Sequence, residues 1–230
     1  MFGREPELAR IERLLEQASA GPAGLALEGV PGIGKSTVWR EGVRSAQDRG
    51  LQVLATAPSE PDAALAFAGL GDLFDQLPSG AVAGLPEPQR RALDAALSVA
   101  DSDAEPVNPQ ALPRAALGVL RTLAEAAPVL VAIDAEQWLD RPSARVLAFA
   151  LCRLTEERVA VLLARRPESG GALWPELTRG FAGDGLQAVT MDPLGLGATR
   201  RLLASVLSSP IGRPLLQRVH EASGGNPLYA

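Results

Sequence analysis

Residues 29–36 read Gly-Val-Pro-Gly-Ile-Gly-Lys-Ser, and this octapeptide fits the pattern G-x-x-x-x-G-K-[ST] at every fixed position. Its glycines let successive backbone N–H groups turn inward and form a concave site for an anion. A helix expected to begin near Gly34 adds its positive end to that site. The motif therefore predicts a phosphate-holding loop between a strand and a helix.

The side chains at the end of the motif have separate expected tasks. Lys35 brings a positive charge to the β and γ phosphate oxygens, and the Ser36 hydroxyl is a ligand for Mg²⁺. Thr37 lies on the α-phosphate side. We expect the chain to bind ATP or ADP with magnesium. The loop residues expected to surround the phosphates are Pro31, Gly32, Ile33 and Gly34.

Short apolar runs alternate with helical periodicity along the chain, and the runs show little period-two pattern, which is typical of a parallel sheet buried on both faces. We predict a three-layer α/β P-loop fold. Because a second strand and several helices separate Gly29 from Asp134, the five strands should lie in the order 5-1-4-3-2. The expected strands are 25–28, 51–57, 129–134, 159–164 and 186–191. The expected helices are 5–18, 36–48, 64–77, 87–100, 112–126, 143–154, 198–207 and 215–222, with a polar loop at 101–106.

A second magnesium ligand is expected where the run Val-Leu-Val-Ala-Ile ends in Asp134, because a P-loop site needs a carboxylate from another strand. An acid usually follows this aspartate and positions the attacking water. Here that position holds Ala135. Glu136 comes next, but strand alternation should turn it away from the site. The pattern predicts intact nucleotide binding and very slow hydrolysis.

Two arginines, Arg165 and Arg166, end the fourth expected strand, and ligands of parallel α/β sheets bind at the carboxyl ends of strands. One interpretation is that one of them, with Arg166 favoured, senses the γ-phosphate. The alternative is a surface pair beside Pro167. The candidate catalytic residues are therefore Lys35, Asp134 and Arg166.

Composition excludes several other functions. A formal charge of −5 and a pI near 5.1 argue against nucleic-acid binding by this segment, since phosphate neutralisation needs clustered Lys and Arg. One cysteine and one histidine cannot build a structural zinc site or an internal disulfide. No apolar run approaches the roughly 20 residues that span a bilayer, and the N-terminus is not a secretory signal. We expect a cytoplasmic protein without a membrane partner.

Four segments, in this order, resemble one family. Phe2 to Glu5 is similar to the opening h-G-R-E motif of the STAND class of AAA+-like P-loop ATPases, and Glu28 to Ser36 is similar to their E-G-x-x-G-I-G-K-[ST] loop. The segment Ile133 to Asp140 resembles the D-D-x-Q-W-L-D segment of the large ATP-binding LuxR-type transcriptional regulators. Gly224 to Tyr229 resembles the G-N-P-L-[FY] motif of their helical lid.

The resemblance implies an N-terminal ATPase core, with a nucleotide-binding domain at 1–192 and a truncated helical lid at 193–230. Phe2 and Arg4 would border the adenine, and Pro227 would close over the base. Family members are closed with ADP and open to self-association with ATP. The resemblance also implies a DNA-binding domain beyond residue 230.

Two other functions stay open at this stage. A free-standing ATPase or metabolic kinase would turn over nucleotide for a second substrate, but the sequence offers no site for one. A non-hydrolysing interaction module would keep nucleotide as a permanent ligand. Ala135, where the family has a second aspartate, puts turnover in doubt but leaves binding untouched.

Overall fold

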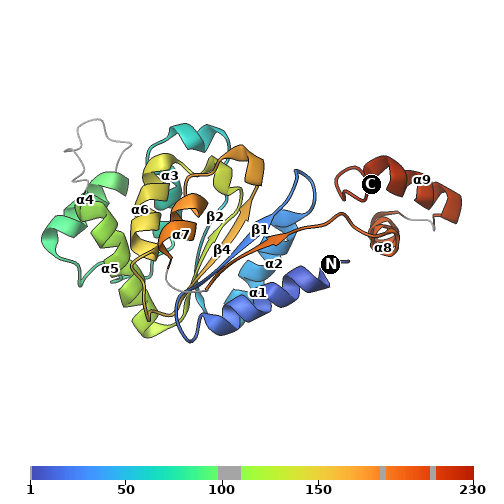
Figure 1. Ribbon diagram of the computed structural model, residues 1–230. Coiled ribbons are helices and arrows are strands. Elements are labelled where there is room, and N and C mark those ends of the chain that lie inside the picture. The colour runs from blue at the N-terminus through green and yellow to red at the C-terminus, as the bar shows by residue number, and fades with distance from the viewer. Residues whose placement is uncertain (1, 98–109, 182–184, 208–210) are drawn as a thin grey trace.

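The computed structural model describes residues 2–97, 110–181, 185–207 and 211–230. Five parallel strands form one sheet with helices on both faces (Figure 1). Their spatial order is β2-β3-β4-β1-β5, which read from the other edge is the predicted 5-1-4-3-2. The strands are β1 (Ala23–Glu28), β2 (Gln52–Thr56), β3 (Val129–Ile133), β4 (Val159–Arg165) and β5 (Leu186–Thr190).

The central strands are buried on both faces, which explains their unbroken apolar sequences. In β3, Leu130 and Ala132 point into a core shared with α1 (Glu5–Gln17) and α2 (Lys35–Asp48). Val131 and Ile133 point into a second core on the other face. The helices packed on that second face are α3 (Ala68–Phe74), α4 (Glu87–Leu97), α5 (Ala111–Ala126), α6 (Arg141–Leu151) and α7 (Trp174–Gly180).

Two further helices, α8 (Leu196–Val206) and α9 (Arg213–Ser223), follow β5 and lie apart from the sheet (Figure 1). They lie in residues 193–230, the range that the sequence predicts as a lid and that is called the lid segment below. Three short 3-10 helices complete the described elements: η1 (Pro61–Ala64), η2 (Glu136–Trp138) and η3 (Pro167–Ser169). The predicted loop at 101–106 and the end of the helix predicted at 87–100 lie outside the described residues. Within the described ranges, no helix combines the length and the apolar character that a membrane crossing requires.

The helix predicted at 64–77 is wrong in its first part. The chain forms η1, turns through Phe67 at φ +64°, and only then starts α3. Asp140, just before α6, causes the break: its two carboxylate oxygens accept the N–H groups of Phe67 (2.9 Å) and Gly69 (3.0 Å). The same carboxylate accepts Ser143 N–H at 2.9 Å, so one side chain caps two helices. A contact between residues about 70 positions apart thus overrides local helical periodicity.

Candidate functional site

The phosphate loop connects β1 to α2, as the motif predicts. Gly34 at φ +103° precedes the first residue of the helix, Lys35. Gly32 has a φ of +79°, and a Cβ placed there would lie 2.6 Å from Leu228 Cβ. Both the backbone conformation and the close approach of the lid segment therefore require glycine at position 32.

The Lys35 side chain folds over the loop. Its Nζ donates hydrogen bonds to the carbonyl oxygens of Gly29 (2.8 Å) and Val30 (2.9 Å). Burial lowers the pKa of Lys35, and the nearby positive charge of Arg166 lowers it further, while Asp134 acts in the opposite direction. Lys35 thus lies where the charges of a bound phosphate, Arg166 and Asp134 would all act on it.

A polar cavity of about 230 Å³ lies over the loop and the start of α2. It brings together every expected phosphate and magnesium residue except Ile33, and it includes Arg166 as the sequence interpretation favours. Gln137, which the sequence interpretation did not include, also lines it. The lining residues are Pro31, Gly32, Gly34, Lys35, Ser36, Thr37, Asp134, Ala135, Gln137 and Arg166.

Asp134 directly follows β3, and its N–H donates to Thr56 O of the neighbouring strand at 2.9 Å. The Ser36 hydroxyl and the Asp134 carboxylate line the same cavity. Two oxygen donors beside a phosphate site fit Mg²⁺, which is usually held by one or two protein groups, substrate phosphates and water. Ala135 follows at φ +56°, a left-handed conformation that is costly for alanine.

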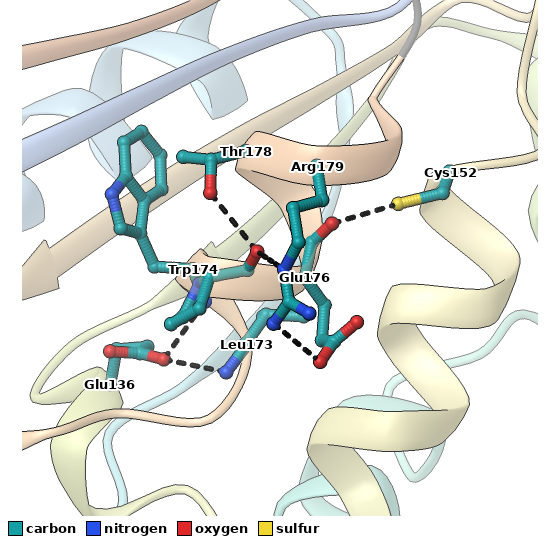
Figure 2. A network of polar contacts seen from close by, with 8 residues as sticks. Glu136, Cys152, Leu173, Trp174, Glu176, Thr178 and Arg179 are labelled. Atoms are coloured by element: carbon teal, nitrogen blue, oxygen red, sulfur yellow. Dashed lines mark hydrogen bonds and ion pairs between the residues drawn. The ribbon is translucent and has the colours of Figure 1, made fainter.

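Glu136 lies away from the cavity and caps α7 (Figure 2). Its Oε1 accepts the N–H groups of Leu173 (2.8 Å) and Trp174 (3.1 Å), and the side chain is fully buried. This role is not predictable from the sequence pattern, because α7 is only seven residues long and has no periodic signal of its own. At the other end of α7, Cys152 Sγ lies 3.7 Å from Glu176 O.

Arg165, the last residue of β4, and Arg166, which follows it, have different surroundings. Arg166 lines the polar cavity, and its N–H donates to Gln137 Oε1 at 3.3 Å. Arg165 is buried and pairs with Glu28, the last residue of β1. The surface pair considered as an alternative is therefore wrong for Arg165.

A second, mostly apolar cavity of about 360 Å³ adjoins the first, and Gly34 and Thr37 line both. It contains the residues expected around the adenine, together with Ile33 of the loop. Glu41, Leu194 and Leu202 were not anticipated; Glu41 could have been found one helical turn after Thr37. The lining residues are Phe2, Arg4, Ile33, Gly34, Thr37, Glu41, Leu194, Leu202 and Pro227.

Arg4 connects three parts of the site. Its guanidinium donates to Ile33 O of the loop at 2.6 Å and to Asp192 O, where the chain leaves β5, at 2.7 Å. It also pairs with Glu7 of α1 at 3.0 Å. Arg4 therefore borders the apolar cavity while its polar atoms hold the surrounding backbone.

The lid segment touches the loop directly. Asn226 Nδ2 donates to Pro31 O at 2.9 Å, and Asn226 Oδ1 accepts Leu228 N–H at 3.0 Å. Pro227, between them, lines the apolar cavity. The asparagine of the G-N-P-L segment thus has a contact that its position in the motif did not reveal.

The loop after β1, the order of the strands and the position of Asp134 are those of a P-loop ATPase domain, a class that binds nucleotide at the carboxyl edge of its sheet. The chain belongs to the AAA ATPase domain family, whose sequence model matches residues 1–164. No curated protein sequence matches it significantly.

Solved structures with the same fold include a chain of the E. coli MS115-1 HORMA:CdnC:Trip13 complex, with a TM-score of 0.57, 14% identity, and coverage of 97% of this chain and 74% of that one. The Aeropyrum pernix ORC2 protein in its ADP form gives a TM-score of 0.58 and 16% identity over 100% of this chain and 60% of its own. AMPPCP-bound DnaA from Aquifex aeolicus gives a TM-score of 0.52 and 11% identity, with coverage of 94% of this chain and 55% of the DnaA chain. The chain thus spans little more than half of the ORC2 and DnaA chains.

Proposed function

We propose that this domain is a nucleotide-operated switch that binds ATP or ADP with Mg²⁺. The polar cavity would hold the phosphates against Lys35 and the loop, and the apolar cavity would hold the base. The Ser36 hydroxyl and the Asp134 carboxylate would hold the magnesium ion, which would neutralise phosphate charge. Arg166 would contact the γ-phosphate.

The observation that carries this proposal is the contact between the lid segment and the loop. Asn226 is hydrogen bonded to Pro31 O, and Leu228 lies against Gly32. Phosphates bound inside this loop would therefore act on a segment that also holds Pro227 over the base cavity. Because the same few residues contact both nucleotide and lid segment, a change from ADP to ATP can alter how the segment lies on the domain.

The switch would operate within a transcriptional regulator of the LuxR type, in the STAND class, with the ATP state controlling self-association. The sequence motifs at 133–140 and 224–229 support this role. Exposed apolar side chains near the loop, Val30, Leu228 and Tyr229, support an assembly surface. DNA binding would belong to a domain beyond residue 230, in a cytoplasmic protein.

Titration calorimetry with ADP and ATP, with and without Mg²⁺, tests the switch. The parent should bind both nucleotides with micromolar or tighter dissociation constants, and magnesium should strengthen ATP binding. Lys35→Ala should remove most of the affinity, whereas Arg121→Met, an arginine change at the opposite edge of the sheet, should not. Equal binding by the Lys35→Ala variant and the parent would refute the loop assignment.

A second readout uses the fact that Lys35 is the only lysine in the chain. An amine-acylating reagent can therefore modify only Lys35 and the N-terminus, and peptide mass spectrometry separates the two. The lowered pKa of Lys35 favours reaction near neutral pH. ADP should protect Lys35 and leave labelling of the N-terminus unchanged.

A non-hydrolysing module remains the second candidate, and one observation favours it. Ala135 offers no carboxylate beside Asp134, and the next acid in the sequence, Glu136, accepts the first N–H groups of α7. In that case nucleotide would exchange slowly and would not be turned over.

A further inference from the structure

At the ends of three adjacent strands, a charged side chain lies next in sequence to the phosphate loop or to a residue that lines the polar cavity. Glu28 ends β1 and precedes Gly29 of the loop, and Arg165 ends β4 and precedes Arg166. Glu136 follows β3, two positions after Asp134. Because β4 lies between β3 and β1, Arg165 has one of these acids on each side.

Arg165 contacts both acids. Its Nη1 pairs with Glu28 Oε1, and its Nε lies 3.6 Å from Glu136 Oε2. The side chains are 8% (Arg165), 16% (Glu28) and 1% (Glu136) exposed, so water hardly screens these charges. The guanidinium also lies over the Trp174 ring of α7, at 5.7 Å from its centroid.

The charged cluster of Arg165, Glu28 and Glu136 lies where the hydrogen-bonded ladders between the strands end. The register of β3 with β4 runs only to Ile133 and Leu163, and that of β1 with β4 runs to Glu28 and Arg165. Asp134 N–H still donates to Thr56 O of β2, but beyond those pairs the ladders that connect β3 through β4 to β1, and so to the loop, have ended. Past this point, the guanidinium of Arg165 connects Glu28, just before the loop, to Glu136, just after the Asp134 turn.

Because Arg165 and Glu136 are buried and Glu28 is partly buried, their pairing resists a change in the spacing of the strands. A buried charge that loses its partner is costly, so an outward shift of β1 or β3 would leave Glu28 or Glu136 uncompensated. A planar guanidinium meets two carboxylates through different nitrogens held in a fixed geometry, whereas lysine offers one nitrogen at a single point on a flexible chain. Glu136 is in turn held in place by the N–H groups of Leu173 and Trp174.

We propose that Arg165 is a positioning residue that sets the distance between the phosphate loop and the magnesium carboxylate Asp134. This inference rests on the proposed nucleotide and magnesium site. Arg165 acts through Glu28 and Glu136, while its neighbour Arg166 faces the cavity itself. Binding of ADP without metal needs only the loop. The gain in affinity that Mg²⁺ gives to ATP needs Ser36 and Asp134 at the correct spacing.

The test measures that gain as the ratio of ATP dissociation constants without and with Mg²⁺, alongside metal-free ADP affinity. Arg165→Lys and Arg165→Met should lower the ratio by about tenfold or more, because residues that orient metal ligands typically account for about 10–100-fold in metal affinity, and should leave metal-free ADP binding within about twofold. Glu136→Gln, which keeps an acceptor for the α7 N–H groups, should lower the ratio in the same direction. Arg121→Met, which breaks the pair with Glu157 at the other edge of the sheet, should leave the ratio unchanged.

An unchanged ratio in both Arg165→Lys and Glu136→Gln would overturn the inference, and so would an equal loss of metal-free ADP binding, which a general loss of folding produces. If Arg165→Met does not fold, Arg165→Lys and Glu136→Gln decide the question. Failure of the proposed function looks different: the parent itself would not bind nucleotide, or would bind it equally after Lys35→Ala. A parent that binds ATP with no gain from Mg²⁺ also overturns the positioning role.

Discussion

Asn226 and Pro31 are 195 positions apart in sequence, yet the Asn226 side-chain amide donates to the Pro31 carbonyl oxygen at 2.9 Å. This contact lies between the loop that would hold phosphate and the segment that would cover the base. Its loss should therefore affect how fast nucleotide leaves more than whether it binds.

Removing this contact should speed the release of ADP. We expect Asn226→Ala to raise the dissociation rate about 2- to 10-fold, the range for losing one neutral hydrogen bond, measured by stopped-flow displacement of a fluorescent ADP. Asn226→Asp keeps the acceptor for Leu228 N–H but sets a charged oxygen against Pro31 O in place of the donor, so ADP should leave at least as fast as from Asn226→Ala. Unchanged release of ADP from both variants would show that the contact between Asn226 and Pro31 does not hold nucleotide in place.

Hydrolysis should be well below the roughly 1–100 s⁻¹ of kinases and should rise when an acid is restored beside Asp134. General-base help is typically a factor of about 10²–10⁴, so Ala135→Asp should raise single-turnover ATP hydrolysis visibly at saturating Mg²⁺. Nucleotide affinity should change little, since Lys35, Ser36 and Asp134 are intact.

Ala135→Asn is the matched control for this change. Asparagine also tolerates the left-handed backbone at φ +56° but brings no carboxylate. A rise with aspartate and none with asparagine would assign the effect to the acid. Equal rates for all three proteins, or several turnovers per second in the parent, would show that another group positions the water.

Asp140 should be among the most sensitive positions for stability. It is 1% exposed and accepts three backbone N–H groups from two helices. Asp140→Ala leaves those donors buried without partners and should lower the free energy of unfolding by about 3–5 kcal/mol in urea titrations. Asp140→Asn keeps one acceptor and should lose roughly half as much. A loss below about 1 kcal/mol for alanine would contradict the double cap.

The ionisation of Glu157 should make the free energy of unfolding depend on pH in the acid range. Partial burial acts to raise the pKa of Glu157, but N–H groups of Thr155 and Glu156 and the Arg121 side chain outweigh it and lower the pKa to about 2. A carboxyl with a lowered folded-state pKa stabilises the protein above its ordinary value of 4.5 and loses that effect as pH falls toward 2.

The matching experiment compares the parent with Glu157→Gln. The parent should be more stable at pH 7, and the difference should shrink between pH 4.5 and about 2 in chemical denaturation at fixed temperature. A difference that persists undiminished at pH 2 would show that packing rather than ionisation stabilises this position.

Much of the fold could be predicted because its signals are local. The β3 run is apolar on both faces and ends in Asp134, and the glycines of the loop fix the turn between β1 and α2. The sheet order predicted from the second strand and the helices that separate those two motifs is confirmed. The boundaries of β1 to β5 depend on neighbouring strands, and they differ by one or two residues from the predicted ranges.

The remaining features depend on contacts between distant residues. Phe67 leaves the helical conformation because Asp140 captures its N–H, and no periodicity in residues 64–77 contains that information. α7 is too short for a periodic signal, and Glu136 selects its start from 37 positions away. The apolar cavity likewise joins Phe2 to Leu202 through folding alone.

Because α7 packs against Cys152, the reactivity of this thiol reports on the position of the helix. Cys152 is the only cysteine in the chain, it is half-buried, and burial raises the pKa of its thiol, so the reactive thiolate is scarce while α7 is in place. Because Glu136 ties α7 to the turn after Asp134, the alkylation rate of Cys152 would respond to how closely α7 packs against the end of α6. Comparing that rate with and without nucleotide would measure, with no engineered cysteine, whether nucleotide binding at the cavity alters the packing of the outer helices.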